Sequence, residues 1–170
     1  MAVQPEVTQS ETGGPPMVRT MKRKAGATWK RGAFLTYVAA TGLEECASPI
    51  TTGKIVGMAA HEVPLANPKA DDLTTAIVIM ADEDSLFTVD TESLTLADTM
   101  ISNGYQLVKA ANGNWMVDIV SAAAATNPAI AVQLDPRDQP PLRLGPDPTP
   151  PVRRVIIKLN PASRALASGV

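Results

Sequence analysis

The sequence is poor in the residues that build disulfides and zinc sites. Its 170 residues include one cysteine, Cys46, and one histidine, His61. A lone cysteine cannot form an internal disulfide, and a zinc site needs several Cys or His ligands. We therefore expect neither feature, and no other metal or cofactor is predicted.

Aromatic residues and net charge are also scarce. Aromatics make up 4% of the chain against 45% hydrophobic residues overall, so aliphatic side chains must supply most of the core. The formal net charge of −2 implies by itself neither a nucleic-acid nor a membrane partner. No apolar run approaches the ~20 residues of a membrane span, and the first residues lack the apolar centre of a secretory signal. These features predict a soluble protein that is made in a cytoplasm.

Residues 1–25 show neither helical nor strand periodicity and are interrupted by Gly13-Gly14-Pro15-Pro16. This pattern predicts an extended N-terminal arm. Two interpretations stay open: the arm orders on a neighbouring subunit, or it is a disordered leader without a role. If the first holds, deletion of residues 1–24 should leave a folded body that no longer attaches to its partner.

A basic segment lies at the end of the arm and runs into a strand-prone stretch with aromatic residues. Cations beside an aromatic residue suit phosphate contact with base stacking, but such a run is more often the solvated face of a strand. An acidic patch on a protein partner is the preferred counterpart, and no nucleic acid is expected. The candidate partner-binding residues are Arg19, Lys22, Arg23, Lys24, Trp29, Lys30 and Arg31.

The clearest local signal is a hairpin in the second half of the chain. Asn112-Gly113 separates two short apolar stretches, and this dipeptide favours the tight turn of a β-hairpin. Before it, apolar residues between Leu96 and Ile101 suit about a turn and a half of helix that ends at Asn103-Gly104.

Other short apolar runs predict further strands. Gly57 within one of them indicates a bulge or a close backbone approach. The run at 86–89 is predicted to pair antiparallel with 73–80 across an acidic turn. Short strands with one short helix predict an all-β fold, a small sandwich or barrel. The predicted strands are 29–38, 53–60, 73–80, 86–89, 105–120 as a hairpin, 129–134 and 152–159.

The predicted organisation has three parts. Residues 1–25 form the arm, 26–160 the β-rich body, and 161–170 a C-terminal tail. Within the body, residues 139–151 are dense in proline, which favours an extended loop.

Catalytic candidates are weak. Cys46 and His61 could form a nucleophilic pair only if the fold brings them together, and lone cysteines usually serve packing. The run 82–84 could hold a hard cation but lacks the alternation of a calcium loop, and it is more often a soluble turn. Asp98 and Asp118 could pair as acid and base only with a geometry that the sequence does not reveal. We therefore predict no catalytic residues and no enzymatic activity.

Several segments together resemble the capsid decoration, or cement, proteins of tailed bacteriophages. The closing strand 152–159 fits the same pattern, whereas the long arm and the proline-rich loop do not. The segments that carry the resemblance are Trp29-Lys30-Arg31-Gly32-Ala33-Phe34-Leu35, Ile55-Val56-Gly57-Met58-Ala59, Leu96-Ala97-Asp98, Gly104-Tyr105-Gln106-Leu107 and Asn112-Gly113-Asn114-Trp115-Met116-Val117-Asp118.

The resemblance implies a structural virion protein on the capsid exterior. Such a protein binds the outside of the major capsid protein lattice and bridges neighbouring capsomers, as a homo-oligomer with a trimer favoured and a dimer possible. The alternative is a binding module of the tail or baseplate that recognises a host-surface glycan. That alternative needs exposed aromatic residues near carboxylates.

Overall fold

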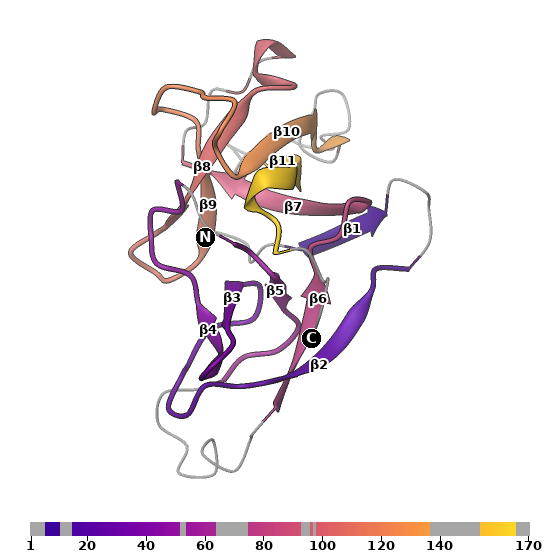
Figure 1. Ribbon diagram of the computed structural model, residues 1–170. Coiled ribbons are helices and arrows are strands. Elements are labelled where there is room, and N and C mark those ends of the chain that lie inside the picture. The colour runs from indigo at the N-terminus through magenta and orange to yellow at the C-terminus, as the bar shows by residue number, and fades with distance from the viewer. Residues whose placement is uncertain are drawn as a thin grey trace, which may run out of the picture.

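The computed structural model describes residues 6–10 by their backbone, and residues 15–51, 54–63, 75–92, 96, 98–136 and 154–165 in full (Figure 1). The predicted proline-rich loop at 139–151 lies outside the described residues, as do the last five residues of the predicted tail. Apart from two short 3-10 helices, the named elements are strands, so the predicted all-β fold is confirmed.

The first sheet lies in the upper half of Figure 1 and contains a closed barrel. Its strand order is β1-β7-β11-β10-β8-β9, and β9 also pairs in parallel with β7 through Asp90↔Met116 and Thr91↔Val117. Five strands, β7, β11, β10, β8 and β9, therefore form a closed ring. β1 pairs with β7 on the edge that β9 also uses. The strands are β1 (Glu6–Ser10), β7 (Ser85–Thr91), β8 (Gly104–Lys109), β9 (Trp115–Asp118), β10 (Ala129–Leu134) and β11 (Arg154–Leu159).

The second sheet lies below it and has the order β2-β6-β5-β3-β4. Its two outer strands meet at one end, where Arg23 and Leu43 form a parallel bridge. The strands are β2 (Val18–Lys22), β3 (Phe34–Val38), β4 (Gly42–Glu45), β5 (Gly57–Ala59) and β6 (Thr75–Met80).

One hydrophobic core joins the two sheets. Phe34 of the second sheet packs edge-to-face on Phe87 and Trp115 of the first, with ring centroids 5.9 Å apart in both pairs. The segment between β4 and β5 adds a backbone contact to the first sheet, because Ile50 donates its N–H to the carbonyl oxygen of Leu107 in β8 at 2.7 Å. Edge-to-face aromatic pairs contribute beyond their buried area, so the few aromatic residues are concentrated where the sheets meet.

The predicted hairpin is confirmed. It consists of β8 and β9, and Gly113 in its turn has a φ of +84°, which explains the preference for glycine. The predicted helical turn is shorter than expected: the 3-10 helix η2 covers Asp98–Met100. In the tail, Asn160 caps a second 3-10 helix, η4 (Pro161–Ser163), by accepting from Ala162 N at 3.1 Å.

The predicted pairing between 73–80 and 86–89 is wrong. β6 and β7 belong to different sheets, with β6 between β2 and β5, and β7 beside β11. The turn between them is fixed by Ser85, whose Oγ donates to the Met80 carbonyl at 2.8 Å or to Asp82 Oδ1 at 2.6 Å. The acidic turn therefore carries the chain from one sheet to the other.

Residues 1–25 contribute two strands where the sequence predicts an extended arm. β1 pairs antiparallel with β7, and β2 pairs antiparallel with β6 over its whole length. Because β2 covers one edge of the second sheet, deletion of residues 1–24 would remove part of the fold. The predicted deletion is therefore not a clean test of attachment.

Candidate partner-binding edge

The first part of β2 has an open edge on the side away from β6 in the described part of the chain, whereas the end of β2 meets β4 at the Arg23–Leu43 bridge. Met80 N donates to the Met17 carbonyl at 2.8 Å, and the register pairs Val18 with Ile79 and Thr20 with Ile77. Backbone groups alternate in direction along an antiparallel strand, so those of Val18 and Thr20 point away from β6. These N–H and C=O groups can pair with another strand.

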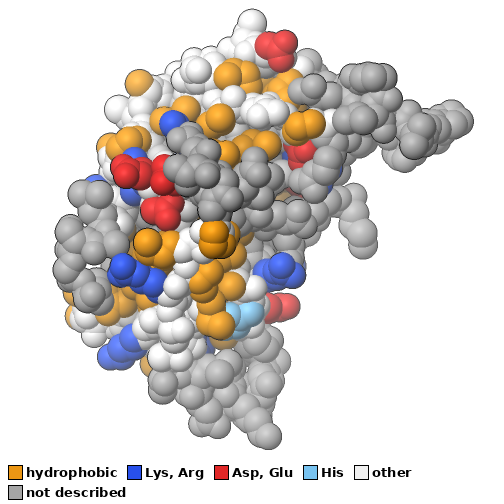
Figure 2. Space-filling model, turned by 90° about the vertical axis from the view of Figure 1, so that its right-hand side faces the viewer, with side chains coloured by type: hydrophobic (Ala, Val, Ile, Leu, Met, Phe, Trp, Pro, Cys, Tyr) orange, Lys and Arg blue, Asp and Glu red, His pale blue; other side chains and the backbone are white. Residues whose placement is uncertain are grey.

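The outer face of the β2–β6 pair is apolar and exposed. Val18 is 54% exposed and Ile77 is 44% exposed, although both are β-branched residues that normally pack on a neighbour. Figure 2 shows hydrophobic side chains gathered in a strip on the side of the molecule where β2 and β6 lie, with Lys and Arg side chains on either side. The open edge and the exposed face together form a surface that a partner strand would extend.

Arg19 and Lys22 place two cations on the same strand, and both side chains are exposed. The neighbouring predicted residues have other roles. Arg23 is 4% exposed and its guanidinium Nη1 donates to the Ala27 carbonyl at 2.6 Å, whereas Lys24 forms an ion pair with Glu44. Only part of the predicted basic segment is therefore accessible on this edge.

The remaining predicted partner-binding residues lie elsewhere. Trp29 is 4% exposed and belongs to the core, where its backbone pairs with Val63. Lys30 is exposed and donates from Nζ to the Asn112 carbonyl at 2.6 Å, and Arg31 is exposed beside it. Trp29 is therefore not placed to stack on a ligand at the surface.

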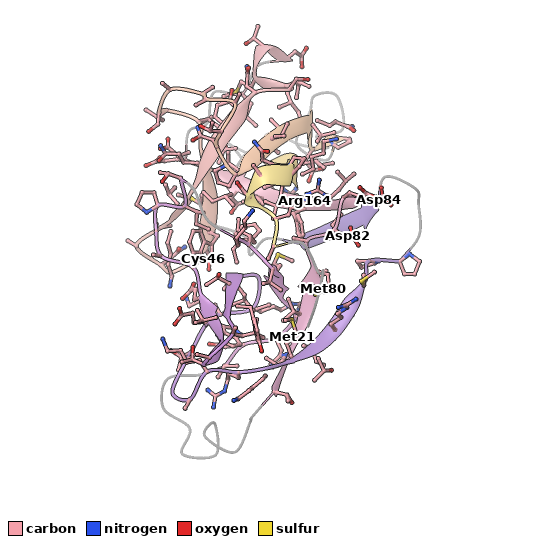
Figure 3. All side chains as sticks on the ribbon, viewed as in Figure 1. Met21, Cys46, Met80, Asp82, Asp84 and Arg164 are labelled. Atoms are coloured by element: carbon pink, nitrogen blue, oxygen red, sulfur yellow. The ribbon has the colours of Figure 1, made fainter. Side chains whose placement is uncertain are left out.

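A cavity of about 320 Å³ opens beside β2, and the sequence did not predict it. It lies between the start of β2, the turn from β6 to β7 and the segment after η4, so its walls come from distant parts of the chain (Figure 3). No motif could have revealed it. Its lining residues are Met17, Arg19, Met80, Ala81, Asp82, Glu83, Arg164 and Ala165.

Cys46 is poorly suited to act as a nucleophile. Burial, with a smaller contribution from the neighbouring Glu45 and Glu44 carboxylates, raises the pKa of its thiol to about 12. The thiolate is the reactive form, so at neutral pH this cysteine stays protonated and unreactive.

The predicted carboxylate candidates serve turns. Asp82 Oδ1 accepts from Asp84 N at 3.1 Å, and Asp118 Oδ1 accepts from Ser121 N at 2.9 Å. Burial alone would raise the pKa of Asp118, but hydrogen bonds from Ser121 and Val120 outweigh it and hold that pKa below its usual value. Among the residues the structure describes, no group of three or more Cys, His, Asp or Glu side chains is arranged to hold a metal ion.

Comparison of the chain with family models, with curated proteins and with solved structures finds no match. None of the helices in the described ranges has the length and apolar character of a membrane span.

Proposed function

We propose that this chain is a structural virion protein that binds the outer surface of a major capsid protein lattice and stabilises it by bridging neighbouring capsomers. The proposal starts from the sequence resemblance to capsid decoration proteins. The structural observation that supports it best is the open edge of β2 with its exposed apolar face. A protein that works by attachment needs such a surface rather than a reactive site.

Strand addition is the mode of attachment that this edge favours. An extended segment of the capsid protein would pair with the backbone groups of Val18 and Thr20, and its side chains on the exposed face would pack beside Val18. Main-chain hydrogen bonds would supply affinity, and the apolar face would fix the register.

Charge favours a different protein over a second copy at this edge. If two β2 strands paired with each other, Arg19 and Lys22 of both copies would lie along one ribbon, and clustered like charges oppose such pairing. A segment with acidic side chains would instead pair with these cations. Oligomers of this protein, with a trimer favoured, would therefore form through another surface.

An oligomer would strengthen attachment without a deep pocket on each subunit. Once one subunit is bound, the others engage at a high effective concentration, so modest contacts add up to a lasting bond. This arrangement suits a protein that bridges capsomers on the capsid exterior.

The aromatic residues do not favour the glycan-binding alternative. All six are described, and Trp29, Trp115, Phe34, Phe87 and Tyr105 are buried, which leaves only the half-buried Tyr37 for stacking on a sugar.

Imaging of particles tests the proposal. Capsids assembled without this protein are mixed with the purified chain, and capsids with and without the added chain are imaged by electron cryomicroscopy. We expect added density on the outer surface between neighbouring capsomers. The absence of added density, or density confined to the interior, would contradict the proposal.

A further inference from the structure

The cavity beside β2 contains an arginine with an unsatisfied donor. Arg164 Nε is buried and has no hydrogen-bond partner among the described residues. The backbone around it is fixed, because Arg164 bridges to Ile55 and Ala165 N donates to the Ile55 carbonyl at 2.9 Å. A buried donor without an acceptor is unfavourable, so this arginine favours a ligand that brings an acceptor oxygen to its guanidinium group.

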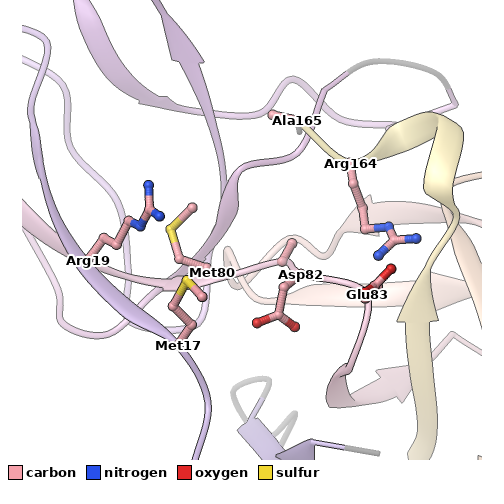
Figure 4. A pocket seen from close by; sticks show the side chains of 8 residues that line it. Met17, Arg19, Met80, Asp82, Glu83, Arg164 and Ala165 are labelled. Carbon is pink, nitrogen blue, oxygen red and sulfur yellow. The ribbon is translucent and has the colours of Figure 1, made fainter. Parts of the chain in front are cut away.

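A second arginine lies on the opposite side of the cavity. Figure 4 shows Arg19 and Arg164 with the cavity between them. The Arg19 side chain is exposed, and within the described ranges it forms no hydrogen bond or ion pair. Guanidinium groups bind carboxylates through charge-assisted hydrogen bonds, so the two arginines define the chemistry of the acceptor.

Two carboxylates also face the cavity and restrict the ligand. Asp82 uses Oδ1 within the turn, where Asp84 N and Ser85 Oγ donate to it, and Glu83 is exposed to solvent. These carboxylates disfavour a simple anion such as phosphate. They suit a ligand that also carries a donor, because the other oxygen of Asp82 can accept from it.

The remaining walls are apolar and adaptable. Met17 and Met80 contribute flexible thioether side chains, which fit many shapes of aliphatic group. The volume of about 320 Å³ is near the lower end for binding sites, so the ligand is small or is one part of a longer chain.

We propose that this cavity binds an acidic residue of an extended peptide. The side-chain carboxylate accepts from the guanidinium groups of Arg164 and Arg19, a backbone N–H of the peptide donates to Asp82, and the aliphatic part contacts Met17 and Met80. This inference rests on the proposed function, because Met17 and Arg19 lie along β2, where the partner segment would run.

Peptide titration of the full chain tests the inference. The probes are two blocked pentapeptides, acetyl-Val-Thr-Glu-Val-Thr-amide and the same peptide with Gln in place of Glu. Binding is followed by the arginine Nε–H signals in NMR spectra of the ¹⁵N-labelled protein. We expect the Glu peptide to bind at least about tenfold more tightly and to shift the Arg164 signal, since only the carboxylate forms charge-assisted bonds.

Three variants test whether Arg164 is responsible for the preference for the Glu peptide. Arg164→Gln should reduce the preference for the Glu peptide to less than about threefold, and Arg164→Lys should restore it only in part, because lysine lacks the planar donor set. Lys109→Gln removes an exposed cation outside the cavity and should leave the preference intact. Equal binding of the two peptides, or an unchanged preference in a folded Arg164→Gln protein, would overturn the inference.

Capsid binding separates this inference from the proposed function. If the wild-type chain decorates capsids but shows no preference for the Glu peptide, the cavity assignment fails and the function stands. If the peptide binds as expected but capsids stay undecorated, the proposed function fails and the cavity assignment stands.

Discussion

Replacement of Gly57 by alanine should destabilise the protein strongly. A Cβ atom at this position would lie 2.1 Å from the Ile79 carbonyl oxygen and 2.8 Å from Val78 Cγ1, whereas real Cβ atoms essentially never approach other atoms within 3.0 Å. Ile79 O is a backbone atom of β6, so the neighbouring strand must shift by about 1 Å within a close-packed core. The paired backbone bonds of β5 and β6 would then be lost or weakened.

The expected cost is about 3 kcal/mol or more. Overpacking of a core costs about 1–3 kcal/mol, and each lost hydrogen bond between β5 and β6 adds about 0.5–1.5 kcal/mol. For a chain of this size, that corresponds to a fall in Tm of about 6–12 °C. Urea and thermal unfolding followed by tryptophan fluorescence measure it well, because Trp29 and Trp115 are both almost completely buried.

Gly26 supplies the matched control. Its φ is +71°, and a Cβ added there would have no atom of the described chain within 4 Å. Alanine at this position therefore costs only what the left-handed backbone imposes, about 1 kcal/mol. If Gly57→Ala costs no more than Gly26→Ala, the close packing of β5 on β6 is refuted.

Two further predictions concern the junction between the sheets. Glu45→Ala removes the acceptor of the buried Trp115 Nε1–H, 2.9 Å away, and should cost about 1–3 kcal/mol in urea unfolding, whereas Glu45→Gln keeps an acceptor and should cost clearly less; equal costs would contradict this role. The raised pKa of Cys46 means that ionisation of the thiol favours the unfolded chain. The stability that the buried, protonated thiol contributes is therefore fully present below about pH 9 and is lost as pH rises toward about 12. Between pH 7 and about pH 10, Cys46→Ala should therefore lose less stability than the wild type, and an equal loss would show that the thiol is not buried as described.

Local signals in the sequence were sufficient to predict the elements whose conformation depends on neighbouring residues. The β8–β9 hairpin follows from Asn112-Gly113, and β10 has the bounds predicted for the strand 129–134. The close approach expected at Gly57 is also confirmed. At these positions a turn or a lack of side-chain volume dictates the structure.

Features that depend on long-range packing could not be predicted. In β2 the polar residues Arg19 and Thr20 are adjacent, so the strand lacks a clear alternating pattern, and its pairing with β6 decides its conformation. The partition of β6 and β7 between two sheets overrides the local preference for a hairpin. Likewise, burial of Trp29 depends on its backbone pairing with Val63, and the cavity joins residues from Met17 to Ala165.

Attachment through the open edge of β2 is tested most directly with Thr20→Pro. Proline removes an N–H that points away from β6, so it blocks strand addition and leaves the β2–β6 pairing in place, whereas Thr20→Val keeps that N–H. The measurement is the occupancy of each protein on capsids, determined by electron cryomicroscopy. We expect Thr20→Val to match the wild type and a folded Thr20→Pro protein to lose most of its occupancy; full occupancy of Thr20→Pro would contradict attachment through this edge.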